Sequence, residues 1–184
     1  MSSIQAAPLT VEDYRLLPED GPRYQLIEGE RYTAPAPNRC HQDISLNIEL
    51  MLAEYLKKHS VGRIYHAPFD VYLDETNAHQ PDVVFIARSN YSILSDAGCE
   101  GAPDFVVEIL SPKTAHLDKK AKRPIYARAG VKELRIVDPD AKCIDVYLLQ
   151  KDADRPAASY TERDVFSSPH FPGLKISGAK IFKR

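Results

Sequence analysis

The chain has 184 residues, of which 43% are hydrophobic, and its formal net charge at neutral pH is -2. This length and apolar content are enough for one core, so we expect a single domain spanning residues 1–184. The slightly acidic balance argues against a globally basic nucleic-acid binder, although it is compatible with a local basic patch. The three cysteines lie far apart and outside CxxC pairs, which argues against a disulfide framework or a thiolate zinc site.

The first ten residues, MSSIQAAPLT, lack the basic and then apolar layout of a signal peptide. No apolar run approaches the length of a membrane-spanning helix. We therefore expect a soluble, cytoplasmic protein without membrane contacts.

The N-terminal part of the chain predicts a short helix, a hairpin and a long helix. Thr10 followed by Asp13 resembles a capping box, and Pro18 ends the short helix that it opens. The stretch RYQLIEGERYTA alternates apolar and polar residues around Glu28-Gly29, which is typical of two short strands joined by a turn. Between residues 41 and 59 the apolar residues follow helical spacing and predict an amphipathic helix.

Strands follow, interrupted by one more helix. The segments RIYH, FDVYLD, PDVVFIA and DFVVEIL have the β-branched and aromatic composition of strands. A second helix is predicted within Thr114 to Ala129, with Gly130 at its C-cap. ELRIVD and KCIDVYLL predict two paired strands, and FPGLKI lies in a tail with one or two edge strands. This mixed order predicts an α/β fold with a central mixed sheet flanked by helices.

An acidic residue interrupts the most apolar of these strands. Glu108 stands inside the run from Phe105 to Leu110, which is apolar on both faces and should be covered on both sides. An ionised carboxylate is unfavourable there unless a partner compensates its charge. A second acid, Asp82, heads the segment DVVFI. Carboxylates from neighbouring strands raise each other's pKa unless a cation holds them, and such hard oxygen ligands suit Mg²⁺ or Mn²⁺.

A basic run follows Glu108. Between residues 113 and 135 the chain has eight lysines or arginines against two acids. A solvated helix face is the usual explanation of such a run, and contact with phosphate groups is the alternative. The candidates for phosphate contact are Lys119, Lys120, Arg123 and Arg128.

Asp118 and Lys122 are four residues apart, so on a helix they share a face and can form an ion pair. From that face a lysine can reach back to the C-terminal half of the preceding strand. A metal and a lysine together could activate water and stabilise the charge on a phosphodiester. Pro124 removes a helical hydrogen bond and disfavours helical geometry at the residue before it, so the helix is expected to begin late or to kink there.

These residues resemble a known superfamily of nucleases. Pro81-Asp82, followed later by an acid inside an apolar strand, is similar to the PD-(D/E)XK pattern, except that Leu110 stands where the pattern has a lysine. The longer run resembles the Uma-type family of restriction endonucleases within that superfamily, in which the lysine has moved onto the following helix. The resemblance covers about Leu9 to Leu149. Its pattern falls on Glu108, Ser111-Pro112, Asp118, Lys122 and Tyr126 to Val131.

The resemblance implies a restriction endonuclease-like fold and a Mg²⁺-dependent enzyme that hydrolyses phosphodiester bonds in DNA. By analogy with other enzymes of this fold, it also implies a homodimer. The residues to which it assigns the chemistry are the metal ligands Asp82, Glu108 and, through its main-chain carbonyl, Ile109; Lys122, which acts on the attacking water; and Asp118, which orients Lys122.

Alternatives remain open at several positions. Asp82 is also typical of a residue that caps a turn at the start of a strand, and Glu108 is compatible with a buried ion pair that needs no metal. Lys122 is compatible with a surface lysine, with Lys113 as the reserve candidate for its role. Glu28 is either a hairpin residue or a third acid that faces the metal. His41 is either an ordinary residue of a helix start or a substrate contact.

The nuclease hypothesis itself has two alternatives. One is a nucleic-acid-binding protein that keeps the fold but does not cleave. The other is a protein-interaction domain that binds an acidic partner through the basic helix. None of the basic residues forms a base-reading motif, so the sequence predicts neither a preferred site nor a preferred form of nucleic acid.

Overall fold

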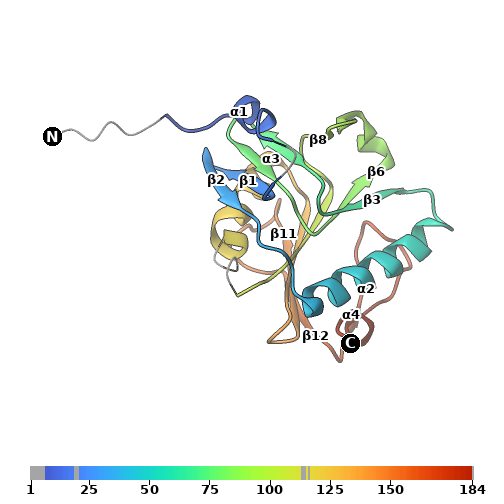
Figure 1. Ribbon diagram of the computed structural model, residues 1–184. Helices are drawn as coiled ribbons and strands as arrows, with labels where there is room; N and C mark the ends of the chain where they lie inside the picture. Colours follow the sequence, from blue (N-terminus) through green and yellow to red (C-terminus); the bar gives the residue numbers. More distant parts are fainter. Residues whose placement is uncertain (1–6, 19–20, 113–114, 116, 184) are drawn as a thin grey trace.

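The computed structural model describes residues 7–18, 21–112, 115 and 117–183, with only the main chain of Lys119. Its centre is a six-stranded sheet with the strand order β12-β11-β10-β9-β6-β3 (Figure 1). β9 runs parallel to β10 and the other neighbouring pairs are antiparallel, so the sheet is mixed, as predicted. In chain order these strands are β3 (Gly62–His66), β6 (Val83–Ala87), β9 (Phe105–Ile109), β10 (Glu133–Asp138), β11 (Cys143–Leu148) and β12 (Ala158–Thr161).

A second sheet, with the order β2-β1-β5-β4-β8-β7, contains strands that the sequence predicts less completely. The hairpin expected around Glu28-Gly29 forms β1 and β2 at one of its edges. β5, β7 and β8 have two or three residues each, which is too short for an alternating pattern. The bounds are β1 (Tyr24–Ile27), β2 (Glu30–Thr33), β4 (Val71–Asp74), β5 (Asn77–His79), β7 (Leu94–Ser95) and β8 (Gly98–Glu100), with a separate pair of β13 (Val165–Phe166) and β14 (Ile176–Ser177).

Side-chain caps mark the starts of α1 and α2. The capping box of Thr10 and Asp13 is present at the start of α1. Asn38 caps α2, its side chain accepting a hydrogen bond of 2.9 Å from the main-chain N–H of His41. None of the described helices is both long and apolar enough to span a membrane. The described helices are α1 (Val11–Arg15), α2 (Arg39–Leu56), the 3-10 helix η1 (Arg88–Ile93), the π-helix η2 (Leu117–Lys122), α3 (Arg123–Ala129) and α4 (Gly178–Ile181).

The central sheet is covered on both faces, which explains its apolar strands. α2 packs on one face with Ile44, Ile48 and Leu52, and α4 lies beside α2 near the C-terminus (Figure 1). α3 and part of the second sheet pack on the other face. Since side chains alternate along a strand, Phe105, Val107 and Ile109 of β9 face α2, whereas Val106, Glu108 and Leu110 face α3. The strand geometry therefore directs Glu108 toward the basic segment that follows it.

The predicted second helix is divided at Pro124. The chain forms the π-helix η2 up to Lys122, and α3 starts at Arg123, so Pro124 lies in the first turn of α3. There its missing N–H removes no hydrogen bond from the interior of the helix. Gly130 ends α3 in the left-handed conformation, with φ of 104°. The helix therefore does not begin late, because Ala115 is already helical; what changes before Pro124 is the helix type, from π-helix to α-helix.

A buried ion pair links the C-terminal part of the chain to β10. Glu133 and Arg135 are 1% and 4% exposed, and Arg135 Nη2 lies 2.7 Å from Glu133 Oε1. The hydroxyl of Ser168 donates to the other oxygen of Glu133 at 2.8 Å. The guanidinium also lies 5.0 Å from the ring centroid of Phe105 and 5.1 Å from that of Phe166. Removal of either charge would leave the other one buried without a partner.

We expect Arg135→Met to destabilise the protein by about 3–5 kcal/mol, because it leaves the Glu133 carboxylate buried and uncompensated. The double variant Glu133→Gln/Arg135→Met should recover part of this loss, since it buries no lone charge. Urea denaturation measures both free energies of unfolding. A loss below about 1 kcal/mol in the single variant, which is ordinary for a surface substitution, would contradict the assignment.

Candidate active site

The register of β6 and β9 brings the two acids together. Val83 pairs with Val107 and Val84 with Val106, so one further step along this antiparallel pair sets Asp82 opposite Glu108. Opposite residues of an antiparallel pair project from the same face of the sheet, a few ångströms apart. Two like charges in such a position repel each other, and the groups around them must offset this repulsion.

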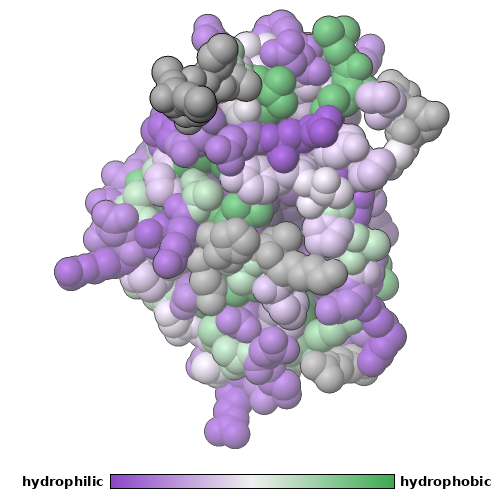
Figure 2. All heavy atoms as spheres, turned by 60° about the vertical axis from the view of Figure 1, so that its left-hand side comes forward, coloured by the Kyte–Doolittle hydropathy of each residue, from purple (hydrophilic) through white to green (hydrophobic). Residues whose placement is uncertain are grey.

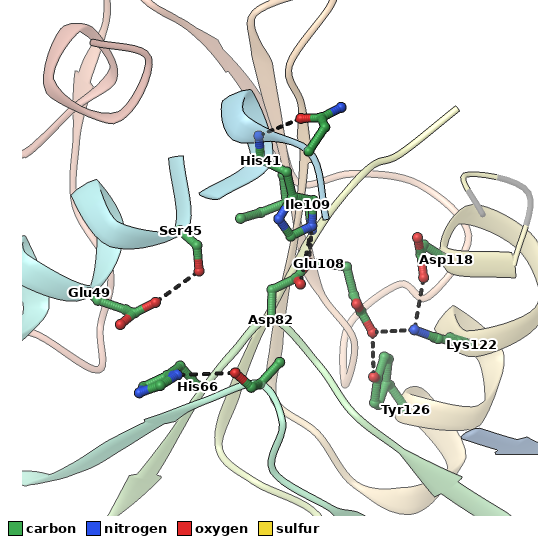
Figure 3. Close-up of polar contacts among 12 residues, drawn as sticks. His41, Ser45, Glu49, His66, Asp82, Glu108, Ile109, Asp118, Lys122 and Tyr126 are labelled. Atoms are coloured by element: carbon green, nitrogen blue, oxygen red, sulfur yellow. Dashed lines mark hydrogen bonds and ion pairs between the residues drawn. The ribbon is translucent and has the colours of Figure 1, made fainter. Parts of the chain in front are cut away.

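Glu108 is compensated by Lys122 and Tyr126, which both approach the same carboxylate oxygen (Figure 3). The Lys122 ammonium lies 3.0 Å from Oε1, and the Tyr126 hydroxyl donates to Oε1 at 2.6 Å. The ammonium also lies 2.9 Å from Oδ1 of Asp118. Glu108, Lys122 and Asp118 are between 3% and 4% exposed, and Tyr126 is fully buried. The cation that the sequence requires beside Glu108 is therefore Lys122.

Burial dominates the ionisation of this cluster. It raises the pKa of Glu108 to about 8; the Lys122 ammonium and the Tyr126 hydroxyl act against this rise, while the charges of Asp118 and Asp82 add to it. Burial by itself would lower the pKa of Lys122, but the carboxylates of Glu108 and Asp118 outweigh it and raise that pKa. Lys122 is thus a cation at neutral pH.

Asp82 is held at both of its oxygens. Its Oδ2 accepts a hydrogen bond of 2.6 Å from the main-chain N–H of Ile109, and its Oδ1 lies 3.2 Å from Nε2 of His41. Burial disfavours a charged imidazole, but the hydrogen bond to Asp82, the charges of Asp82 and Glu108 and the Ile109 carbonyl outweigh it and raise the pKa of His41. His41 and the Ile109 N–H therefore fix the orientation of the Asp82 carboxylate.

These groups line one cavity of about 400 Å³. Its walls come from the first half of α2, from β2 and the loop after it, from the end of β9, and from η2. Asp82, Glu108, Asp118 and Lys122 all contribute to the lining, together with His41. Figure 2 shows the side of the molecule on the left of Figure 1, where hydrophilic side chains predominate and hydrophobic ones are scattered between them. The cavity therefore gathers several carboxylates beside one lysine.

The donor set suits a hard divalent cation. Among the described residues no group of three or more His, Cys, Asp or Glu side chains is arranged to hold a metal. Mg²⁺ does not need such a group, because it is commonly held by one or two carboxylates and keeps several waters. Asp82 and Glu108 offer two carboxylates on one cavity wall, and the Ile109 carbonyl adjoins them. The residues present fit Mg²⁺ or Mn²⁺.

Glu28 does not join this group. It occupies the turn of the β1–β2 hairpin with φ of 51°, and its side chain is 65% exposed. It lies 3.3 Å from Nη1 of Arg128 and does not line the cavity. Of its two readings from the sequence, its position agrees with that of a hairpin residue.

Two arginines of the basic run form contacts within the protein. Arg123 donates to the main-chain oxygen of Asp154 at 2.9 Å and lies over the ring of Tyr147. Arg128 pairs with Glu28 and, at 3.8 Å, with Asp74. Lys120 is exposed. The side chain of Lys119 and the reserve candidate Lys113 lie outside the described residues.

Tyr126 belongs to the family pattern, but the sequence assigns it no role in the site. It is fully buried, yet its hydroxyl contacts Glu108. A signal was present, because Asp118, Lys122 and Tyr126 follow one another at intervals of four residues and so share a helix face. A tyrosine on the same helix face as an aspartate and a lysine can contact the same polar site, which an ordinary core residue does not.

Comparisons with known proteins identify the family and the fold of this chain. The Uma2 family model, described as "Putative restriction endonuclease", matches residues 11–179. A solved structure of "a putative nuclease belonging to DUF820" from Anabaena variabilis superposes with a TM-score of 0.78 at 20% sequence identity. The match covers 95% of this chain and 98% of that one, which confirms the predicted fold. The comparison with curated proteins gives no match.

His79 of β5 lies directly behind this site. It is fully buried, and its ring meets that of Tyr126 edge to face, with 5.1 Å between centroids. Neither ring nitrogen has a hydrogen-bond partner among the described residues. Burial, with the charges of Lys122 and Arg128, lowers the pKa of His79 well below its usual value. The folded protein therefore holds this imidazole in its neutral form.

Acid should destabilise the protein through His79. Below about pH 6.5 His79 takes up a proton in the unfolded chain but not in the folded chain. The free energy of unfolding therefore keeps its full value above that pH and decreases as the pH falls below it. The slope approaches about 1.4 kcal/mol per pH unit for one proton. His79→Phe should reduce the slope of the unfolding free energy between about pH 5 and 6.5 in urea denaturation. The control His59→Phe, at an exposed position, should keep the wild-type slope; an unchanged slope in His79→Phe would contradict the prediction.

Proposed function

This chain belongs to the Uma2 family, and from that premise we propose that it is a metal-dependent nuclease that hydrolyses phosphodiester bonds in DNA. The observation that carries the proposal is the convergence of Asp82, Glu108 and Lys122 on one cavity. Two carboxylates and a lysine form a set suited to phosphodiester hydrolysis, because the reaction needs an activated water and compensation of negative charge.

Asp82, Glu108 and the main-chain carbonyl of Ile109 would hold the cation. When bound, a divalent cation polarises the phosphodiester and lowers the pKa of a coordinated water. His41 and the Ile109 N–H hold the Asp82 carboxylate in a fixed orientation. These contacts support Asp82 as a ligand, because a preorganised carboxylate needs no rearrangement when the cation arrives.

Lys122 would position the attacking water and offset the charge that develops on the phosphate oxygens. An ammonium has three N–H donors, and two of them are directed to Glu108 and Asp118. No further acceptor for Lys122 lies among the described residues, so the third would serve a water or a phosphate oxygen in the cavity that Lys122 lines. Asp118 holds the lysine in this orientation, so its role is to position Lys122.

A plasmid-cleavage assay tests the function. The wild-type protein should nick plasmid DNA with Mg²⁺ and stop when the metal is chelated. Asp82→Asn and Glu108→Gln should each lower the rate on the order of 100-fold or more, because each removes a negative ligand. The matched control Asp145→Asn, a carboxylate-to-amide change on β11 outside the cavity, should keep the wild-type rate.

A gel-retardation experiment separates the nuclease from the non-cleaving binder. A binder would retard DNA with or without metal, would lose binding as salt is added, and would be unaffected by Asp82→Asn. Retardation of this kind without cleavage would contradict the proposed nuclease and support the alternative. A protein that neither cleaves nor binds DNA would contradict both.

Lys120 is the described residue of the basic run that is best placed for phosphate contact, since its side chain is exposed. Lys120→Gln should weaken DNA binding equally for different sequences and reduce the slope of log affinity against log salt by about 1. Binding is measured with Ca²⁺ in place of Mg²⁺ to prevent cleavage. Lys58→Gln, at an exposed position after α2, is the control; equal slopes in both variants would contradict a phosphate contact at Lys120.

A further inference from the structure

The two oxygens of the Glu108 carboxylate have different surroundings. Oε1 meets both the Lys122 ammonium at 3.0 Å and the Tyr126 hydroxyl at 2.6 Å. Among the described residues no side chain donates to Oε2. In Figure 3, Lys122 and Tyr126 lie to one side of the carboxylate and Asp82 to the other. We propose that Tyr126 is a positioning residue, which holds Oε1 so that Oε2 is presented to a cation shared with Asp82; this inference rests on the proposed function.

Tyr126 is suited to this role because its hydroxyl cannot move far. The residue belongs to α3, is fully buried, and packs in the core between the central and second sheets. The ring of His79 closes against it edge to face, with an interplanar angle of 86°. A tyrosine has two side-chain torsions, and packing on all sides restricts both. The hydroxyl is therefore a fixed donor that a carboxylate oxygen has to meet.

Lys122 alone does not select an oxygen in the same way. Its ammonium stays paired with Asp118 but carries three equivalent donors, so it can meet either oxygen of Glu108. The terminal torsion of a glutamate is broad and roughly two-fold, so little in the side chain itself distinguishes the two oxygens. The Tyr126 hydroxyl, which approaches from one direction, makes the distinction.

The consequence concerns cation affinity. Hydrogen-bond partners that orient a ligating group typically contribute between about 10-fold and 100-fold to metal affinity. Without the hydroxyl, Glu108 can turn Oε1 and Oε2 in and out of the cavity, and part of the binding free energy is used to restore the productive orientation. A tyrosine that serves only as core would affect folding stability and leave cation affinity unchanged.

The experiment compares Tyr126→Phe with Tyr55→Phe. Tyr55 is also buried, and its hydroxyl donates to the main-chain oxygen of Pro172 at 2.9 Å, on the opposite face of the sheet. Both variants lose one buried hydroxyl and keep the ring, so their melting temperatures should fall by similar amounts. Binding of Mn²⁺ alone is measured from the electron paramagnetic resonance signal of the free ion. Tyr126→Phe should lower Mn²⁺ affinity at least about 10-fold, and Tyr55→Phe should leave it within about twofold.

The outcomes are distinct. If the wild-type protein binds Mn²⁺ and Tyr126→Phe binds it equally well, the role of Tyr126 is overturned while the proposed function stands. If the wild-type protein binds no Mn²⁺, both are overturned. A second measurement keeps the hydroxyl of Tyr126 and uses protein that contains 3-fluorotyrosine. When Mg²⁺ is added, the ¹⁹F resonance of residue 126 should shift and that of residue 55 should not. An unchanged resonance at 126 overturns the inference even if Tyr126→Phe fails to fold.

Discussion

One buried ion pair governs this structure. Glu108 and Lys122 are each 3% exposed, and neither charge would be stable in that interior without the other. Since the glutamate comes from β9 and the lysine from η2, their pairing ties the helical segment to the sheet. The same ammonium also meets Asp118, so a single cation sets the positions of two carboxylates. η2 ends at Lys122 and α3 begins at the next residue. Tyr126, in α3, donates a hydrogen bond to the same carboxylate.

The other half of the site follows from strand register. Antiparallel pairing of β6 with β9 sets Asp82 opposite Glu108, an arrangement that is unfavourable between two ionised groups. The protein offsets it by surrounding the acids with donors: His41 and the Ile109 N–H at Asp82, and Lys122 with Tyr126 at Glu108. Local departures of this kind from the rules of a stable core are typical of functional sites.

The sequence was most informative where interactions are local. The capping box at Thr10, the hairpin at Glu28-Gly29 and the irregularity of the helix before Pro124 depend on neighbouring residues, and all three are present. β7 and β8 escaped prediction because two or three residues carry no periodicity, and their pairing depends on β4, far away in the chain. Arg123 could not be separated from the solvent-exposed lysines, since its partner Asp154 is 31 residues away.

The sequence by itself predicted that a partner compensates the charge of Glu108, because an apolar run on both faces of a strand predicts burial and a buried carboxylate requires compensation. It also determined the pairing of Asp118 with Lys122, which depends on helical spacing alone. Only the tertiary structure decided that Tyr126 shares the carboxylate and that Glu28 stays outside the cavity. The physical reason is that side-chain contacts between distant segments depend on how α3 and the hairpin pack against the sheet, and no local pattern encodes that packing.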